Sequence, residues 1–156
     1  MMKKLLPMVL VLFTIISCKE NSNDSYDFAK QAQIDDKLIT EFLTKNNLTA
    51  QKHQSGLYYI VSNPGTGNVQ YAANTTVTVK YALRLLNGTT IPQTTEPISF
   101  QLGGVIAGWQ YGVPLIQKGG KIRLIIPSGL AYGPRAQNGI PANSVLDFDI
   151  ELLDVK

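Results

Sequence analysis

Apolar residues recur along this chain with two different periods, and the change of period divides it into a helical part and a β-rich part. Between residues 26 and 47 the spacing is that of one face of a helix, and Asn46-Asn47 is a plausible stop signal. The apolar stripe of this predicted amphipathic helix consists of Ile34, Leu38, Ile39, Phe42 and Leu43. Such a stripe needs a partner, and we expect it to pack on its own domain; a homodimerisation arm is the alternative.

From residue 57 onward the period is two, which predicts β-strands. The alternating segments are residues 57–61, 75–86, 97–102, 121–126 and 146–152. Asn87-Gly88, after the second segment, is a dipeptide typical of tight hairpins. In the last segment Leu146, Phe148, Ile150 and Leu152 alternate with Asp147, Asp149 and Glu151. Strands with one apolar face, one polar face and short turns indicate an antiparallel sheet.

The apolar face of such a sheet must be covered by another element. VIAGWQYGV, residues 105–113, interrupts the alternation and is compatible with a brief helix before Pro114. It contains the only tryptophan of the chain, Trp109. We therefore expect an α+β fold in which a short helix covers an antiparallel sheet, preceded by one amphipathic helix.

The first residues have the pattern of a targeting signal. MMKK is positively charged, and the apolar run over residues 5–16 is shorter than the roughly 20 residues that span a membrane, which is typical of a signal peptide. Cys18 follows Ile-Ile-Ser, a sequence that resembles the lipobox of bacterial lipoproteins, in which the cysteine is lipidated. A short anchor, or a secreted protein with an incidental cysteine, is the alternative.

These patterns divide the chain into four parts. Residues 1–17 are the expected lipoprotein signal peptide, and the polar residues 18–25 are the expected tether. Residues 26–53 hold the amphipathic helix and its connection, and residues 54–156 form the β-rich domain.

Composition excludes several classes of function. The chain has 156 residues and a formal net charge of +3, with no cluster of Lys and Arg of the kind that binds nucleic acid. One cysteine and one histidine exclude a disulfide framework and a Cys/His zinc site. We expect no metal, no cofactor and no nucleic-acid partner, so any chemistry must come from other residues.

Five motifs, in this order and spacing, resemble the FKBP-type peptidyl-prolyl isomerases: VTVKYALRLLNG, PISFQLG, VIAGWQYGV, LAYG and IPANSVLDFDIELL. Each motif is weak alone, and together they are specific. The resemblance covers about residues 57–155 and makes residues 54–156 an FKBP-type isomerase domain. It implies a fold in which an antiparallel sheet wraps around a short helix, as the periodicity also indicates.

The resemblance also implies an activity and a site. Rotation about an X-Pro bond breaks no covalent bond, so a catalyst needs only to bind the twisted amide better than the planar one. By resemblance, Trp109 lies at the base of a proline pocket, and the Ile106 backbone N–H and the Tyr132 hydroxyl donate hydrogen bonds to substrate carbonyls. The implied walls are Tyr81, Val105, Ile106, Tyr132, Ile140 and Phe148.

At two wall positions the sequence departs from the family pattern. Ile91-Pro92 stands where the family usually has an aromatic residue followed by aspartate, and Ile98 stands where a second aromatic is usual. The aspartate is an acceptor that helps to organise the cleft. We therefore expect turnover to be reduced rather than lost.

Three functional hypotheses follow. The first is a lipid-anchored isomerase in a bacterial cell envelope, on a leaflet that the sequence does not identify, acting on proline-containing regions of exported proteins. The second is an FKBP-fold binding module or chaperone in an envelope assembly, with weak turnover or none. The third is a dimeric chaperone clamp built on the helix; we expect a monomer instead, because the helix is short for an arm.

Overall fold

The computed structural model describes residues 26–156. The predicted signal peptide, Cys18 and the predicted tether lie outside the described residues. Within residues 26–156, no helix has the length and the apolar character that crossing a membrane requires.

The sheet is antiparallel throughout. Five of its seven strands follow the predicted alternation, and two short ones, Gln51–Lys52 and Thr90–Ile91, lie outside the predicted segments. In sequence order the strands are β1 (Gln51–Lys52), β2 (Tyr58–Asn63), β3 (Thr76–Leu85), β4 (Thr90–Ile91), β5 (Ile98–Gln101), β6 (Lys121–Ile126) and β7 (Leu146–Val155). Their spatial order is β1-β2-β6-β7-β3-β4, with β5 also paired to β3. The long strands β3 and β7, paired from Val77–Val155 to Leu85–Leu146, form its centre. The predicted α+β class is confirmed.

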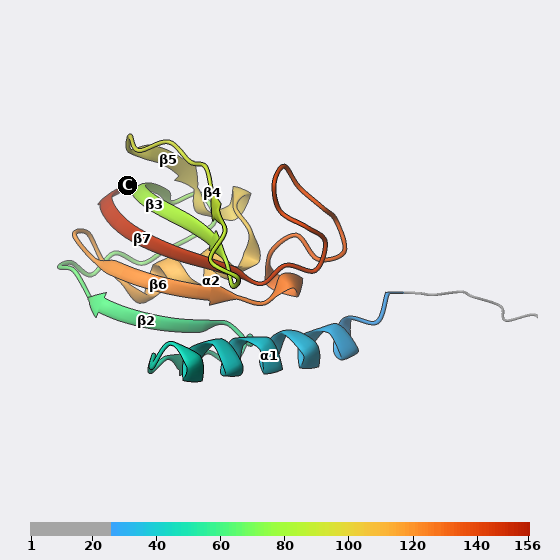
Figure 1. The fold of residues 1–156 in the computed structure, drawn as a ribbon. Coiled ribbons are helices and arrows are strands. Elements are labelled where there is room, and N and C mark those ends of the chain that lie inside the picture. The colour runs from blue at the N-terminus through green and yellow to red at the C-terminus, as the bar shows by residue number, and fades with distance from the viewer. Residues whose placement is uncertain (1–25) are drawn as a thin grey trace, which may run out of the picture.

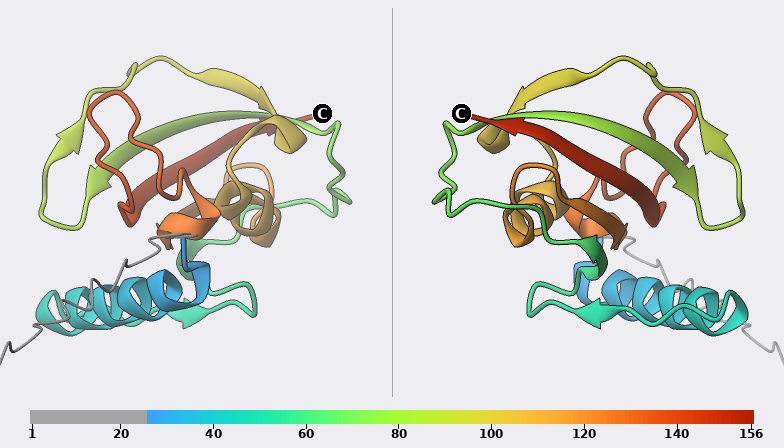
Figure 2. Two further views of the ribbon diagram at one scale, coloured as in Figure 1. Left: turned by 90° about the vertical axis from the view of Figure 1, so that its right-hand side faces the viewer. Right: turned by 90° about the vertical axis from the view of Figure 1, so that its left-hand side faces the viewer.

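A short helix lies against the concave face of this curved sheet (Figure 2). It is α2 (Ala107–Gly112), flanked by the 3₁₀ turns η1 (Leu102–Gly104) and η2 (Val113–Leu115). Gly108 and Gly112 face β6 so closely that a β-carbon on either would collide with Ile126 or Leu124. Two glycines therefore let the backbone of α2 approach the sheet and place Trp109 in the main core.

The amphipathic helix is α1 (Phe28–Lys45), and it lies alongside β2 (Figure 1). The Asp27 carboxylate caps its first turn by accepting a hydrogen bond from the Lys30 N–H. Ile39 and Leu43 are buried in a second core with Tyr58, Ile125 and Val145. The helix thus packs on its own domain, as expected from its stripe.

The orientation of α1 differs from the predicted stripe. Ile34 and Leu38 remain 44% and 45% exposed, whereas Asp35 is completely buried. The helix is turned so that Asp35 faces η3 (Ser128–Leu130), which follows β6. The hydrogen bond between Asp35 and Ser128, together with the burial of Ile39 and Leu43, therefore determines which face of α1 is buried. The apolar pattern alone could not show this.

The predicted polar face of β7 is also partly buried. Asp147 is only 2% exposed and lies between Arg84 of β3 and Arg123 of β6. Arg123 donates from Nε and Nη2 at 2.8 Å and 2.7 Å, and Arg84 donates from Nε at 3.1 Å. The polar face of the sheet thus contains an ion-pair network, although sequence alternation predicted that these side chains would face solvent.

Candidate active site

A cavity of about 440 Å³ opens between the sheet, α2 and the loop that follows η3. Eight of the nine pocket residues predicted from the sequence line it: Tyr81, Ile91, Val105, Ile106, Trp109, Tyr132, Ile140 and Phe148. They come from β3, β4, the start of α2, β7 and the loop, so the fold brings together residues up to 67 positions apart, from Tyr81 to Phe148.

Ile98 is the exception and does not line the cavity. It packs half-buried against the core, and Phe100, two residues further along β5, lines the cavity instead. The longer side chain of Phe100 brings its ring to 5.7 Å from the indole of Trp109, centroid to centroid. The wall of the cavity therefore keeps an aromatic ring on β5, at Phe100, a position that the family resemblance did not select.

Trp109 forms the floor of the cavity and is 2% exposed. Three rings meet its indole edge-to-face: Tyr81 at 5.2 Å, Phe148 at 5.4 Å and Phe100 at 5.7 Å. Edge-to-face pairs of this kind are favourable beyond the area that they bury. The indole Nε1 is buried and has no hydrogen-bond acceptor among the described residues, which is consistent with its being surrounded by rings.

Local backbone hydrogen bonds position the proposed donors. The Ile106 carbonyl accepts from the N–H groups of Trp109 and Gln110 at 3.0 Å and 3.3 Å, so Ile106 stands at the entrance to α2. Tyr132 lies at the rim with 36% of its surface exposed. Its neighbour Gly133 donates to the Ser128 carbonyl and accepts from the Asn143 N–H. Both donors therefore belong to segments held by backbone hydrogen bonds.

Gln93 is a lining residue that sequence reasoning missed. Its Oε1 accepts a hydrogen bond from the Tyr81 hydroxyl at 2.6 Å. The sequence showed that the usual carboxylate is absent at Pro92, and the structure supplies a neutral acceptor one position later. Burial, and then the nearby Tyr132, raise the pKa of Tyr81 above its ordinary value. The hydroxyl therefore stays protonated and keeps donating to Gln93.

Gln93→Ala should lower kcat/KM by a few-fold, because loss of one hydrogen bond of about 0.5–1.5 kcal/mol frees the Tyr81 ring at the wall. The measurement is isomerisation of a proline peptide by wild type and variant. Gln51→Ala is the matched control, since Gln51 accepts from the Tyr59 hydroxyl at 2.7 Å and neither residue lines the cavity. Equal effects of the two substitutions would contradict a role for Gln93 in the cleft.

The cavity is electrically neutral. None of its described lining residues carries a carboxylate, amine, guanidinium or imidazole group. Among residues 26–156 there is also no group of three His, Cys, Asp or Glu side chains placed to hold a metal ion. What the cavity offers a ligand is an aromatic floor, aliphatic walls and a few neutral hydrogen-bonding groups.

Comparison with known proteins agrees with this geometry. A sequence model of the FKBP-type peptidyl-prolyl cis-trans isomerases matches residues 67–153. The chain belongs to this family. A curated relative, the FKBP-type isomerase FkpA of Buchnera aphidicola from Schizaphis graminum, is 49% identical over 108 residues, covering 67% of this chain and 43% of the relative. FkpA of Escherichia coli K12 is 48% identical over 105 residues, covering 65% and 38% respectively.

Solved structures cover more of the chain than the family model does. The crystal structure of FkpA from Escherichia coli is 41% identical, with a TM-score of 0.70 over 81% of this chain and 62% of the other. An isomerase from Pseudomonas syringae pv. tomato is 32% identical, with a TM-score of 0.69 over 81% and 94%. The chain spans less than half the length of the two curated FkpA relatives.

Proposed function

We propose that this protein is a peptidyl-prolyl cis-trans isomerase that binds proline-containing polypeptides in the cavity above Trp109. The observation that carries the proposal is the neutral, aromatic-floored cavity in a chain of the FKBP family. A planar amide is polar and well hydrated, whereas the twisted amide has lost resonance and much of its charge separation. A dry, uncharged cleft therefore favours the twisted form.

Each group has a proposed role in this process. The prolyl ring rests on Trp109, between the rings of Tyr81 and Phe148, and Ile91, Val105 and Ile140 close the aliphatic walls. The Ile106 N–H and the Tyr132 hydroxyl donate to the substrate carbonyls and hold one side of the amide while the other rotates. The barrier is about 18–20 kcal/mol in solution, so lowering it by a few kcal/mol is enough for catalysis.

The deciding experiment is a protease-free isomerisation assay on Leu-Pro-Phe and Ala-Pro-Phe peptides with the full chain and its Tyr132→Phe variant. Turnover by the wild type, reduced in the variant, supports the proposal. Peptide binding that quenches Trp109 fluorescence without turnover would favour a binding module, which the aliphatic Ile91-Pro92 segment at the wall could produce. Absence of both would overturn the proposal.

Isomerisation should be independent of pH between about pH 5 and pH 9. The described lining offers no acid or base for this range, and the raised pKa of Tyr81 keeps its hydroxyl neutral. Because the pKa of Tyr81 is raised in the folded state, the protonated hydroxyl contributes fully to stability below the unfolded-state pKa near 10. This contribution is lost only as the pH rises through the folded-state pKa. A bell-shaped profile of kcat/KM within the range would contradict this mechanism.

We further propose that the protein is lipidated at Cys18 and acts in a bacterial cell envelope on exported proteins. The support is the signal-like segment over residues 1–17 followed by the lipobox-like sequence. Incorporation of a labelled fatty acid by the wild type and not by Cys18→Ser would support lipidation; equal labelling would refute it.

We infer a monomer, because α1 buries Ile39 and Leu43 against its own β2 and β6. A dimeric mass in sedimentation at micromolar concentration would contradict this inference and would revive the chaperone clamp.

A further inference from the structure

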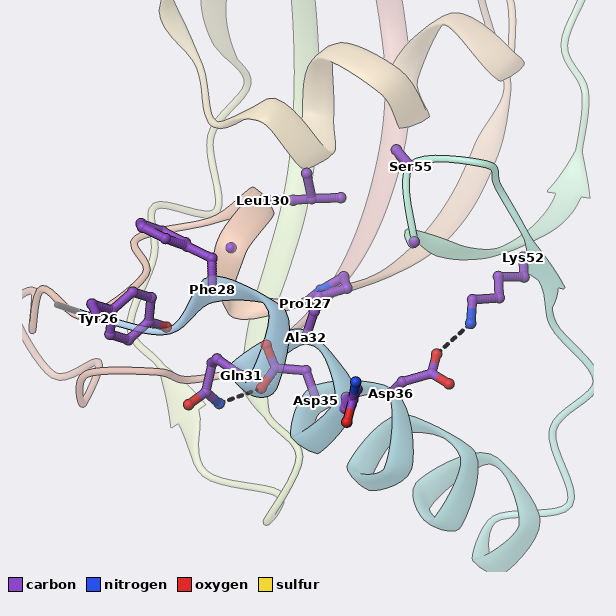
Figure 3. Close-up of a pocket in the computed structure, with 13 residues that line it drawn as sticks. Tyr26, Phe28, Gln31, Ala32, Asp35, Asp36, Lys52, Ser55, Pro127 and Leu130 are labelled. Carbon is purple, nitrogen blue, oxygen red and sulfur yellow. Dashed lines mark hydrogen bonds and ion pairs between the residues drawn. The ribbon is translucent and has the colours of Figure 1, made fainter. Parts of the chain in front are cut away.

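A buried carboxylate joins α1 to the segment that precedes Tyr132. Asp35 is fully buried, and its Oδ2 accepts hydrogen bonds from the backbone N–H and the hydroxyl of Ser128 at 2.8 Å and 2.6 Å. Its Oδ1 accepts from the Gln31 side chain at 2.8 Å, the dashed contact on α1 in Figure 3. No residue among 26–156 forms an ion pair with it. Burying a carboxylate is costly, so these three donors must hold it firmly.

Ser128 passes this restraint on to the rim of the cavity. It is fully buried at the start of η3, and its carbonyl accepts from the N–H groups of Ala131 and Gly133, both at 2.9 Å. These two residues flank Tyr132 on either side. The Gly133 carbonyl in turn accepts from the Asn143 N–H at 2.7 Å, which closes the loop that carries Ile140.

A second contact ties the far end of the same loop to the start of α1. The Tyr26 hydroxyl donates to Oδ1 of Asn143 at 2.8 Å. Asn143 has a φ of 58°, in the left-handed region that side chains rarely adopt without support. Residues 26–35 therefore contact the loop at both of its ends, near residues 128 and 143.

We propose that residues 26–35, which include the first turns of α1, position the loop of residues 128–143 for catalysis, with Asp35 as the principal positioning residue. Asp35 fixes Ser128, Ser128 fixes the backbone around Tyr132, and Tyr26 fixes Asn143. The helix outside the FKBP family match, which covers residues 67–153, is then a functional part of the proline-binding site. This inference rests on the proposed isomerase function.

The neighbouring residue supplies a matched control. Asp36 also ties α1 to the sheet domain, but it accepts from the Tyr58 hydroxyl at 2.7 Å and contacts Lys52, on β2 and β1. In Figure 3 Asp36 points toward Lys52, whereas Asp35 lies on the side of Gln31. Substitution of Asp36 should therefore loosen α1 from β1 and β2 and leave the loop unaffected.

The test compares wild type, Asp35→Ala, Asp35→Asn and Asp36→Ala in the full chain, at a temperature where all are folded. Two quantities are measured: kcat and KM for a proline peptide, and hydrogen exchange of the Arg135 and Asn143 amides, which bond within the loop. Asp35→Ala should lower kcat/KM by about tenfold, within the roughly 100-fold range that misplacement of catalytic groups produces. It should also accelerate exchange at both amides.

The other variants separate positioning from stability. Asp35→Asn should recover most of the activity, because its amide oxygen can accept from both Ser128 donors. Asp36→Ala should lower the denaturation midpoint with kcat/KM and loop exchange unchanged. Equal kcat/KM and equal exchange in Asp35→Ala and Asp36→Ala would overturn the proposal.

If Asp35→Ala does not fold, Ser128→Ala, which removes only the hydroxyl donor, takes its place with the same expectations at smaller size. If the wild type shows no turnover, the proposed function fails, and hydrogen exchange in the loop alone then tests the positioning role. Faster exchange confined to the Asp35 or Ser128 variant supports that role. Unchanged exchange in those variants refutes it.

Discussion

Trp109→Ala is expected to lower kcat/KM by roughly 10–100-fold in the folded protein. The floor of the cavity disappears, and with it apolar contact with the prolyl ring of about 1.5–3 kcal/mol. The three edge-to-face partners of the indole lose their common neighbour as well. Stability should fall by about 3–5 kcal/mol, as for other large core truncations. Isomerisation kinetics and urea denaturation measure the two effects separately.

A second core substitution distinguishes the floor from ordinary core. Leu152 is completely buried in the same hydrophobic core and does not line the cavity. Leu152→Ala should cost about 2–5 kcal/mol of stability while kcat/KM of the folded protein stays at the wild-type value. If folded Trp109→Ala retains wild-type kcat/KM, the indole is core filler and the proposed site is wrong.

Asp147→Ala should be strongly destabilising, with a loss of about 3–5 kcal/mol. The carboxylate is 2% exposed and takes all three of its close hydrogen bonds from Arg84 and Arg123. The hydrogen bond to Asp147 is the main cause of the raised pKa of Arg123. Without Asp147 the partly buried Arg123 loses its hydrogen-bonded carboxylate, and only Asp149, which accepts from Arg84 at 2.6 Å, remains near the two guanidinium groups. Urea denaturation gives the free energy of unfolding.

The matched control is Asp154→Ala, which removes a carboxylate near the end of the same strand. Asp154 is about one-third exposed and pairs with Lys118 at 2.7 Å. An exposed pair of this kind contributes little to stability, so the loss should be correspondingly small. A loss for Asp147→Ala no larger than that for Asp154→Ala would show that burial does not strengthen the network.

Periodicity predicted most of the fold because each strand obeys a local rule. Alternate residues of a strand point to opposite faces, so Leu146, Phe148, Ile150 and Leu152 had to share one face of β7. The same rule places Tyr81 and Leu83 together on β3, where both line the cavity. The family motifs then selected nine candidate site residues, and eight of the nine line one cavity.

Such local rules do not predict contacts between segments that are far apart in the chain. Asp35 lies in the segment predicted as an amphipathic helix, yet Ser128, 93 positions away, donates the hydrogen bonds that hold its carboxylate in the interior. Alternation places Asp147 on the polar face of its strand, yet arginines on two neighbouring strands enclose it. Gln93 accepts a hydrogen bond from Tyr81 because the folded chain brings the segment after β4 next to β3.

The amino-acid sequence by itself determined five of the seven strands, the two helices and most of the apolar residues of the core and the cavity, because helix and strand periods and burial preferences act over a few residues. Tertiary structure decided which face of α1 is buried, which carboxylates leave water, that Phe100 rather than Ile98 reaches Trp109, and that Gln93 accepts from Tyr81. Those outcomes depend on the distance and direction between side chains on different elements, which only the packed fold defines.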